Sequence, residues 1–150
     1  MKEIRWKVFG IGDTALIPRS RLPSDPFFYS CPTTSSDPTV VIKFYAYGAR
    51  IPYEDVAQVL QDAIYLAQRH ARKEEIPSSV RQFNSGDLRL IVHSKGRMTW
   101  GILQTAALGI WNFVDTYEYV DFDFDVGSTE GGVKYYGTGA LASVKRGAEA

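Results

Sequence analysis

The sequence predicts an α+β protein, a ferredoxin-like (split βαβ) sandwich in which an antiparallel sheet carries two helices on one face. Segments in which apolar and polar residues alternate, typical of half-buried strands, are interleaved with segments of helical periodicity. In the middle of the chain the predicted order is strand, helix, strand, strand, helix, strand. The change of period is clearest between Met98 and Val126, where a charge-free helical pattern gives way to strict alternation. Extra strands are predicted toward both ends of the chain.

The composition predicts one soluble domain spanning residues 1–150. Lys and Arg together number 17, as do Asp and Glu, so the formal net charge is zero. A chain without net positive charge has no global field that attracts nucleic acid or an anionic membrane, and we expect neither as a partner. The charges are nevertheless segregated, because the span between Arg97 and Lys134 has acidic residues and no basic one.

Cys31 is the single cysteine, which excludes an intrachain disulfide and a Cys-based zinc cluster. This suits a reducing compartment, and it also suits an exported protein that does not depend on disulfides. The first residues lack the apolar run of a signal peptide. We therefore expect a cytoplasmic protein, or a secreted one if a signal peptide was removed.

The N-terminal third is predicted to contain a strand, a long loop and a second strand. Alternating apolar residues over 4–8 predict the first strand. The segment Pro18–Pro38 holds five of the seven prolines, which predicts an extended loop. Its three consecutive aromatics, Phe27–Tyr29, favour a loop held against an apolar surface. Thr39–Tyr47 is predicted as a strand by its β-branched and aromatic residues, with Tyr45 and Tyr47 on one face.

The next segment is predicted to be an amphipathic helix over 51–75, ended by Pro77. Its expected core residues recur at three- and four-residue spacings: Val56, Val59, Leu60, Ala63, Ile64 and Ala67. A β-hairpin is then predicted from residues 79–83 and 88–93, joined by a turn that contains Gly86.

Thr99 is the expected N-cap of the long apolar helix. Gly109 inside that helix predicts a close contact with another element, because glycine there lowers helix stability by about 1 kcal/mol relative to alanine. The pattern then predicts strands over 119–126 and 133–141 and a frayed tail over 142–150.

Three carboxylates at a spacing of two, Asp121, Asp123 and Asp125, are expected on one face of a strand. They could bind a hard cation such as Mg²⁺ or Ca²⁺ with help from neighbouring strands. They could equally be the solvated side of the sheet, facing basic residues such as Lys43, Arg89 or Lys134 across strands. A straight strand does not wrap an ion, so the second interpretation is favoured, and no metal or other cofactor is expected.

His93, at a strand end, is the best candidate for acid–base catalysis, because the reference pKa of histidine is near 6.5. His70 is expected to be solvated or to cap a helix end. Cys31 could be a nucleophile, but no histidine partner is readable from the sequence. Lys95 and Arg97 precede the start of a helix and could bind an anion there; the alternative is a simple polar turn. RNA recognition is disfavoured, because the strand 88–94 lacks the expected basic and aromatic run.

The run TWGILQTAALGIWNF, followed by YVDFDFDV and a glycine-rich terminal strand, resembles small fungal α+β proteins of unknown function, some of them secreted and effector-like. The likeness covers roughly residues 50–141. The strand order also resembles the α/β-sandwich of killer-toxin-like effectors, which are held by disulfides that this chain cannot form. The resemblance implies no catalytic residues.

The leading hypothesis is a non-enzymatic binding protein, because no paired catalytic constellation is readable. Its expected partner is a protein or a small apolar ligand, and the residues expected to bind it are Phe27, Phe28, Tyr29, Tyr45, Tyr47, Lys95 and Arg97. The alternative is a small cyclase, isomerase or dimeric ferredoxin-like oxygenase with His93 as base. Its apolar pocket would lie between sheet and helices, lined by Trp100, Trp111, Tyr45 and Tyr47. A homodimer formed through an exposed sheet face is compatible with both.

Overall fold

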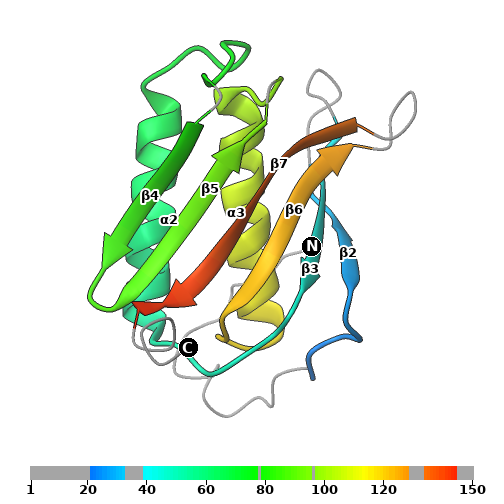
Figure 1. Cartoon of the computed structure of the whole chain (residues 1–150), viewed down its shortest axis with the longest axis vertical. Helices are drawn as coiled ribbons and strands as arrows, with labels where there is room; N and C mark the ends of the chain where they lie inside the picture. The colour runs from blue at the N-terminus through cyan, green and yellow to red at the C-terminus, as the bar shows by residue number, and fades with distance from the viewer. Residues whose placement is uncertain (1–20, 33–38, 78, 96, 129–133, 145–150) are drawn as a thin grey trace.

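The computed structural model describes residues 21–32, 39–77, 79–95, 97–128 and 134–144. They form one six-stranded sheet with two helices on one of its faces (Figure 1). The strands are β2 (Phe27–Ser30), β3 (Val41–Tyr45), β4 (Ser79–Ser85), β5 (Leu88–Ser94), β6 (Phe122–Ser128) and β7 (Lys134–Ser143). The helices are α2 (Tyr53–Gln68) and α3 (Trp100–Thr116). Neither is long and apolar enough to cross a membrane.

The strand order in space is β2-β3-β6-β7-β5-β4, and all neighbours are antiparallel. The predicted α+β class, the antiparallel sheet and the two helices on one face are confirmed. β7 is the additional strand predicted toward the C-terminal end, whereas β2 lies in a segment that was predicted as a loop. β2 forms an edge, whereas β7 enters the interior of the sheet between β6 and β5. β3 and β5, neighbours in the split βαβ arrangement, are therefore separated by β6 and β7.

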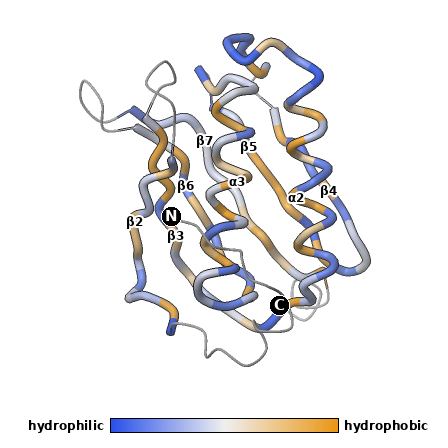
Figure 2. Tube along the Cα trace, turned by 180° about the vertical axis from the view of Figure 1, so that it is seen from behind, coloured by the Kyte–Doolittle hydropathy of each residue, from blue (hydrophilic) through white to orange (hydrophobic). Residues whose placement is uncertain are grey.

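The core lies between the sheet and the helices and is centred on aromatic rings. Phe44 of β3 stacks on Phe113 of α3 with ring centroids 3.8 Å apart and an interplanar angle of 11°. Phe122 of β6 meets both rings edge-on, at 5.1 and 5.6 Å. Viewed from behind, both helices lie over this side of the sheet, and hydrophobic residues recur along α3 (Figure 2). The alternation in β3 and β6 therefore places Phe44 and Phe122 on the side of the sheet that the helices cover.

Several boundaries differ from those predicted. The sequence predicted a loop throughout 18–38, but Phe27–Ser30 pair with β3 as an edge strand, a position that proline-flanked segments tolerate. Helix α2 ends at Gln68 instead of 75. Strand β7 continues to Ser143, so pairing extends into the predicted frayed tail. The predicted first strand over 4–8 and the end of the tail lie outside the described residues.

Gly109 makes the close contact that its place in the helix predicted. A Cβ atom at this position would lie 2.6 Å from the Sγ atom of Cys31 and 3.2 Å from Cδ1 of Ile42. Thr99 caps the helix as predicted, its side chain accepting a hydrogen bond from the N–H of Ile102 at 3.2 Å. Glycine at this position lets α3 approach Ile42 of β3 and Cys31 closely. Even one methyl group added here would overlap the Sγ atom of Cys31.

We expect Gly109→Ala to lower the free energy of unfolding by about 1–3 kcal/mol, because overpacking the contact with Cys31 outweighs the gain of about 1 kcal/mol in helix propensity. Denaturant unfolding monitored by circular dichroism measures the change. In a Cys31→Ala background, which removes the sulfur, the same substitution should cost less or become stabilising. Equal costs in both backgrounds would contradict the proposed contact. Leu108→Ala, at an exposed position of the same helix, is the control.

Candidate functional site

The face of the sheet that lies away from the helices, here called the open face, looks toward the reader in Figure 1. Its side chains are the alternate residues of each strand. One row of them crosses all six strands through consecutive register pairs, and we call it the open-face row: Phe28, Lys43, Asp125, Thr138, His93 and Val80. The middle four members are half-buried, and the two ends, Phe28 and Val80, are 64% and 60% exposed. The row is therefore polar in the centre and apolar at both ends.

Asp125 is the centre of the hydrogen bonding on this face. Its Oδ1 atom accepts hydrogen bonds from the hydroxyl of Tyr45 at 3.0 Å and from Oγ1 of Thr138 at 2.8 Å. Among the described residues no hydrogen bond reaches its other oxygen, Oδ2. Partial burial, and then the hydrogen bond to Asp125, raise the pKa of the Tyr45 phenol above its ordinary 10.0. Tyr45 therefore remains a donor, and Asp125 keeps one carboxylate oxygen available to a ligand or partner.

Lys43 and Asp123 complete the surroundings of Asp125. Lys43 stands opposite Asp125 in register, and its Nζ atom lies 5.1 Å from the ring centroid of Tyr45. Asp123 lies two residues before Asp125 on the same face, opposite Tyr45. The open face thus carries two half-buried carboxylates beside one ammonium group, which favours partners that bring hydrogen-bond donors.

The predicted ladder of three carboxylates is only partly assembled. Asp121 precedes β6 and is fully buried, and its backbone pairs with Gly48 and Ala49, both at 2.9 Å. Of the basic residues expected opposite the ladder, only Lys43 is paired with it in register; Arg89 pairs with Ala142 and Asn84, and Lys134 with Ser128. Within the described residues no group of three or more potential ligands could hold a metal ion.

His93 lies on the open face, between Val80 and Thr138, and does not point between the sheet and the helices. Tyr45 is on the open face as well. Trp100 lies on the opposite side of the sheet, buried and stacked on His70 with ring centroids 3.9 Å apart. The residues expected to line one interior pocket are thus divided between two faces, and Phe44 and Phe113 fill the space where that pocket was expected.

Tyr47 was expected beside Tyr45, and the backbone between them explains why it is not. Ala46 has a positive φ of 58°, and its N–H donates to Oδ2 of Asp25 at 2.8 Å. This turn ends the alternation of β3, and the Tyr47 ring comes to lie 6.1 Å from that of Phe113. Burial raises the pKa of Tyr47 to about 12. Tyr47 is therefore part of the core.

The three aromatics of β2 also divide between the two faces. Phe27 packs at 6.0 Å from Phe113, and the Tyr29 hydroxyl accepts a hydrogen bond from Nδ2 of Asn112 at 3.1 Å. The prediction that these residues hold the segment against an apolar surface is correct for Phe27 and Tyr29. Phe28 alone points outward and belongs to the open-face row.

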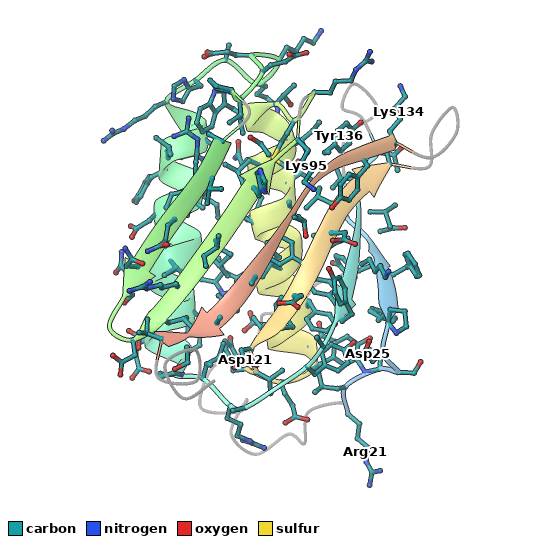
Figure 3. All side chains as sticks on the ribbon, viewed as in Figure 1. Arg21, Asp25, Lys95, Asp121, Lys134 and Tyr136 are labelled. Atoms are coloured by element: carbon teal, nitrogen blue, oxygen red, sulfur yellow. The ribbon has the colours of Figure 1, made fainter. Side chains whose placement is uncertain are left out.

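The anion site expected near Lys95 and Arg97 is not formed at the start of α3. The N–H groups of Trp100 and Gly101 donate to the carbonyls of Glu74 and Arg72, both at 3.0 Å, and that of Ile102 donates to Thr99. The first turn therefore has no N–H left for an anion. Lys95 instead lies over the ring of Tyr135 at 5.7 Å, and it sits at the end of the sheet opposite to Asp121 (Figure 3).

Sequence reasoning missed Thr138, which donates a hydrogen bond to Asp125 and pairs with His93 in register. Its signal was weak, because a threonine between two glycines near the end of the chain has no motif. Only the placement of β7 between β6 and β5 brings Thr138 beside both residues. The members of the open-face row come from six separate strands, and their adjacency depends on register.

The chain was compared with protein-family models, with curated proteins and with solved structures, and no match was found. The resemblance to small fungal effector-like proteins stays a prediction.

Cys31 should behave as an unreactive core thiol. It is 6% exposed, and burial raises the pKa of its thiol from 9.0 to about 12. Because only the thiolate reacts, alkylation by iodoacetamide at pH 8 should be roughly 1,000-fold slower in the folded protein than in urea, and should speed up about tenfold per pH unit. Mass spectrometry of timed samples measures the rate. Labelling of the folded protein as fast as in urea would contradict this assignment and reopen a role as nucleophile.

Proposed function

We propose that this protein is a non-enzymatic binding protein that presents the open face of its sheet to a protein partner. The observation that carries the proposal is the open-face row, in which side chains from all six strands form one surface on the side that the helices leave uncovered. Six strands give a face about 24 Å wide. Each partner of a typical protein complex contributes a patch of about 800 Å², which is about 28 Å on a side if square, so the face is nearly wide enough to hold one.

The shape of the face favours a macromolecule over a small ligand. Small ligands bind in concave pockets that enclose most of their surface. The open face is a sheet surface, and the interior beneath it is filled by Phe44, Phe113 and Phe122. The described surface also has a depression on α2, formed by side chains of that single helix: Asp62, Tyr65, Leu66, Gln68 and Arg69. It brings no polar groups together from different elements.

The chemistry of the face defines the partner. Phe28 and Val80 offer exposed apolar contact at the two ends of the row. Between them, Oδ2 of Asp125 can accept a hydrogen bond, with the carboxylate of Asp123 nearby on the same face. An Arg or Lys side chain between two apolar anchors is the complement, and Arg is the better match because its fork binds carboxylates in two places.

A small enzyme, such as a cyclase or isomerase, is the second candidate, and one observation favours it. His93 stands beside Thr138, whose hydroxyl donates to Asp125, and Tyr45 donates to the same oxygen. An imidazole thus neighbours a threonine hydroxyl that is hydrogen-bonded to a carboxylate, and side chains of these kinds serve in acid–base catalysis. In this candidate His93 acts as acid or base on the open face. It does not act in the interior pocket that the sequence predicted, because Phe44 and Phe113 fill that space.

Substitution of the open face should remove partner binding without unfolding the protein. We expect Asp125→Asn to weaken binding about 10- to 100-fold, because a hydrogen bond to a charged group contributes roughly 1.5–3 kcal/mol. The separate variant Phe28→Ala should weaken binding more than Asp125→Asn does. The measurement is affinity capture of tagged protein from its own host with quantitative mass spectrometry, followed by titration of the captured partner. Tyr65→Ala, at a 67% exposed position of α2, is the matched control.

Partners lost with both open-face variants and kept with Tyr65→Ala support the proposal, whereas equal retention by all three variants overturns it. His93→Ala separates the two candidates. It should leave partner binding within a few-fold of the native protein, whereas in the enzyme it should abolish turnover.

A further inference from the structure

The two edges of the sheet differ in how they are protected against pairing with another strand. Native sheets block their edges with short strands, prolines, charged side chains or bulges. Strand β2 has four residues and is flanked by Pro26 and Pro32, which cannot donate a backbone hydrogen bond. This edge is therefore poorly suited to accept a further strand.

Strand β4 has fewer of these features: Pro77 precedes it by two residues, and one charged side chain lies within it. All seven of its residues pair with β5 in continuous register, and the segment SVRQFNS contains no proline. Its one charged residue, Arg81, is on the helix side, with its guanidinium 5.0 Å from the ring centroid of Trp100. The side chains on the open face are the uncharged Val80, Gln82 and Asn84. In Figure 1 no other described segment lies beside this edge.

The hairpin geometry shows which backbone groups face outward. Ser85 and Leu88 flank a two-residue turn in which Gly86 has a φ of 57°, so this closing pair exchanges hydrogen bonds within the hairpin. Because hydrogen-bonded and non-hydrogen-bonded pairs alternate along antiparallel strands, the N–H and C=O groups of Val80, Gln82 and Asn84 point away from β5. Three consecutive outward-facing residues form a template centred on Gln82.

We infer that β4 pairs with β4 of a second copy of this chain, antiparallel and with Gln82 of the two copies on the two-fold axis. A two-fold axis places the same residues on both sides of the interface, so the strand must complement itself. With Gln82 at the centre, Val80 faces Asn84 and Arg81 faces Phe83 of the second copy. This register forms about six backbone hydrogen bonds and sets no like charges directly opposite one another.

The neighbouring registers are less favourable. An axis at Arg81 sets the two Arg81 side chains directly opposite each other. An axis at Phe83 slides the two strands past each other by two residues and leaves Val80 beyond the paired segment. Only the axis at Gln82 uses every outward backbone group and covers Val80, which is 60% exposed in the monomer. The self-complementarity of one strand thus selects both the partner and the register.

The pairing joins two six-stranded sheets into one continuous sheet of twelve strands with all helices on one side. Both open faces then lie side by side on the other side. The inference does not depend on the proposed function, but the two are compatible, because neither face is used in the contact.

A charge swap at Gln82 tests the inference on the full chain. Sedimentation equilibrium and native mass spectrometry should show a dimer of the native protein. Gln82→Lys and Gln82→Glu each place like charges on the axis and should each raise the dimer dissociation constant at least about tenfold. Mixing the two variants should restore dimerisation, because Lys then faces Glu. Gln68→Lys, the same change at an exposed position of α2, should have no effect.

The restored mixture also shows that the two variants fold. A native protein that stays monomeric at every concentration tested would overturn the inference. So would a dimer that both Gln82 variants leave intact, which would assign the contact to the open face or to the helices. Gln82→Cys gives an independent readout, since paired Cα atoms about 5.5 Å apart allow a disulfide across the axis. Cys31 is buried and should not compete.

Discussion

The stacking of Phe44 on Phe113 is the contact on which the rest of the structure depends. The rings join β3, the second strand from one edge of the sheet, to the last turn of α3, and Phe122 from β6 packs edge-on against both. Buried aromatic pairs of this kind stabilise by about 0.5–1.5 kcal/mol beyond the area they remove from water. Once these rings are in place, α3 must lie on one face of the sheet, and α2 packs beside it on the same face.

The same contact decides where chemistry can occur. Because the aromatic cluster fills the space between sheet and helices, the titratable residues that were candidates for an interior site either lie on the open face or are held in the core. Tyr45 and His93 are in the first group, and Tyr47 and Cys31 in the second. The filled interior thus favours recognition across the open face over chemistry in an enclosed pocket.

The sequence predicted the class of fold and the direction of most side chains, because these depend on local periodicity. Most of the predicted core positions of α2 and the cap at Thr99 follow from spacing alone, although Ile64 is only partly buried. The place of β7 could not be predicted, since strand order is decided by contacts between distant segments. Tyr47 was misplaced because one residue, Ala46, adopts a positive φ that alternation does not anticipate. The open-face row could not be predicted for the first of these reasons: Thr138 lies beside both His93 and Asp125 in register only because β7 is central.

The central place of β7 also explains why the unprotected edge is β4. Glycines at 137 and 139 let the strand enter the interior, and the ring of Phe124 covers Gly139, where an added Cβ would lie 2.5 Å from it. Because β7 lies inside the sheet, the edge beyond β5 is formed by β4, the first strand of the β4–β5 hairpin, which pairs with β5 in continuous register. A regular edge whose open-face side chains are uncharged is a liability for a monomer, because it can pair with another exposed strand. Pairing with its own copy removes that liability and leaves the open face of each protomer accessible.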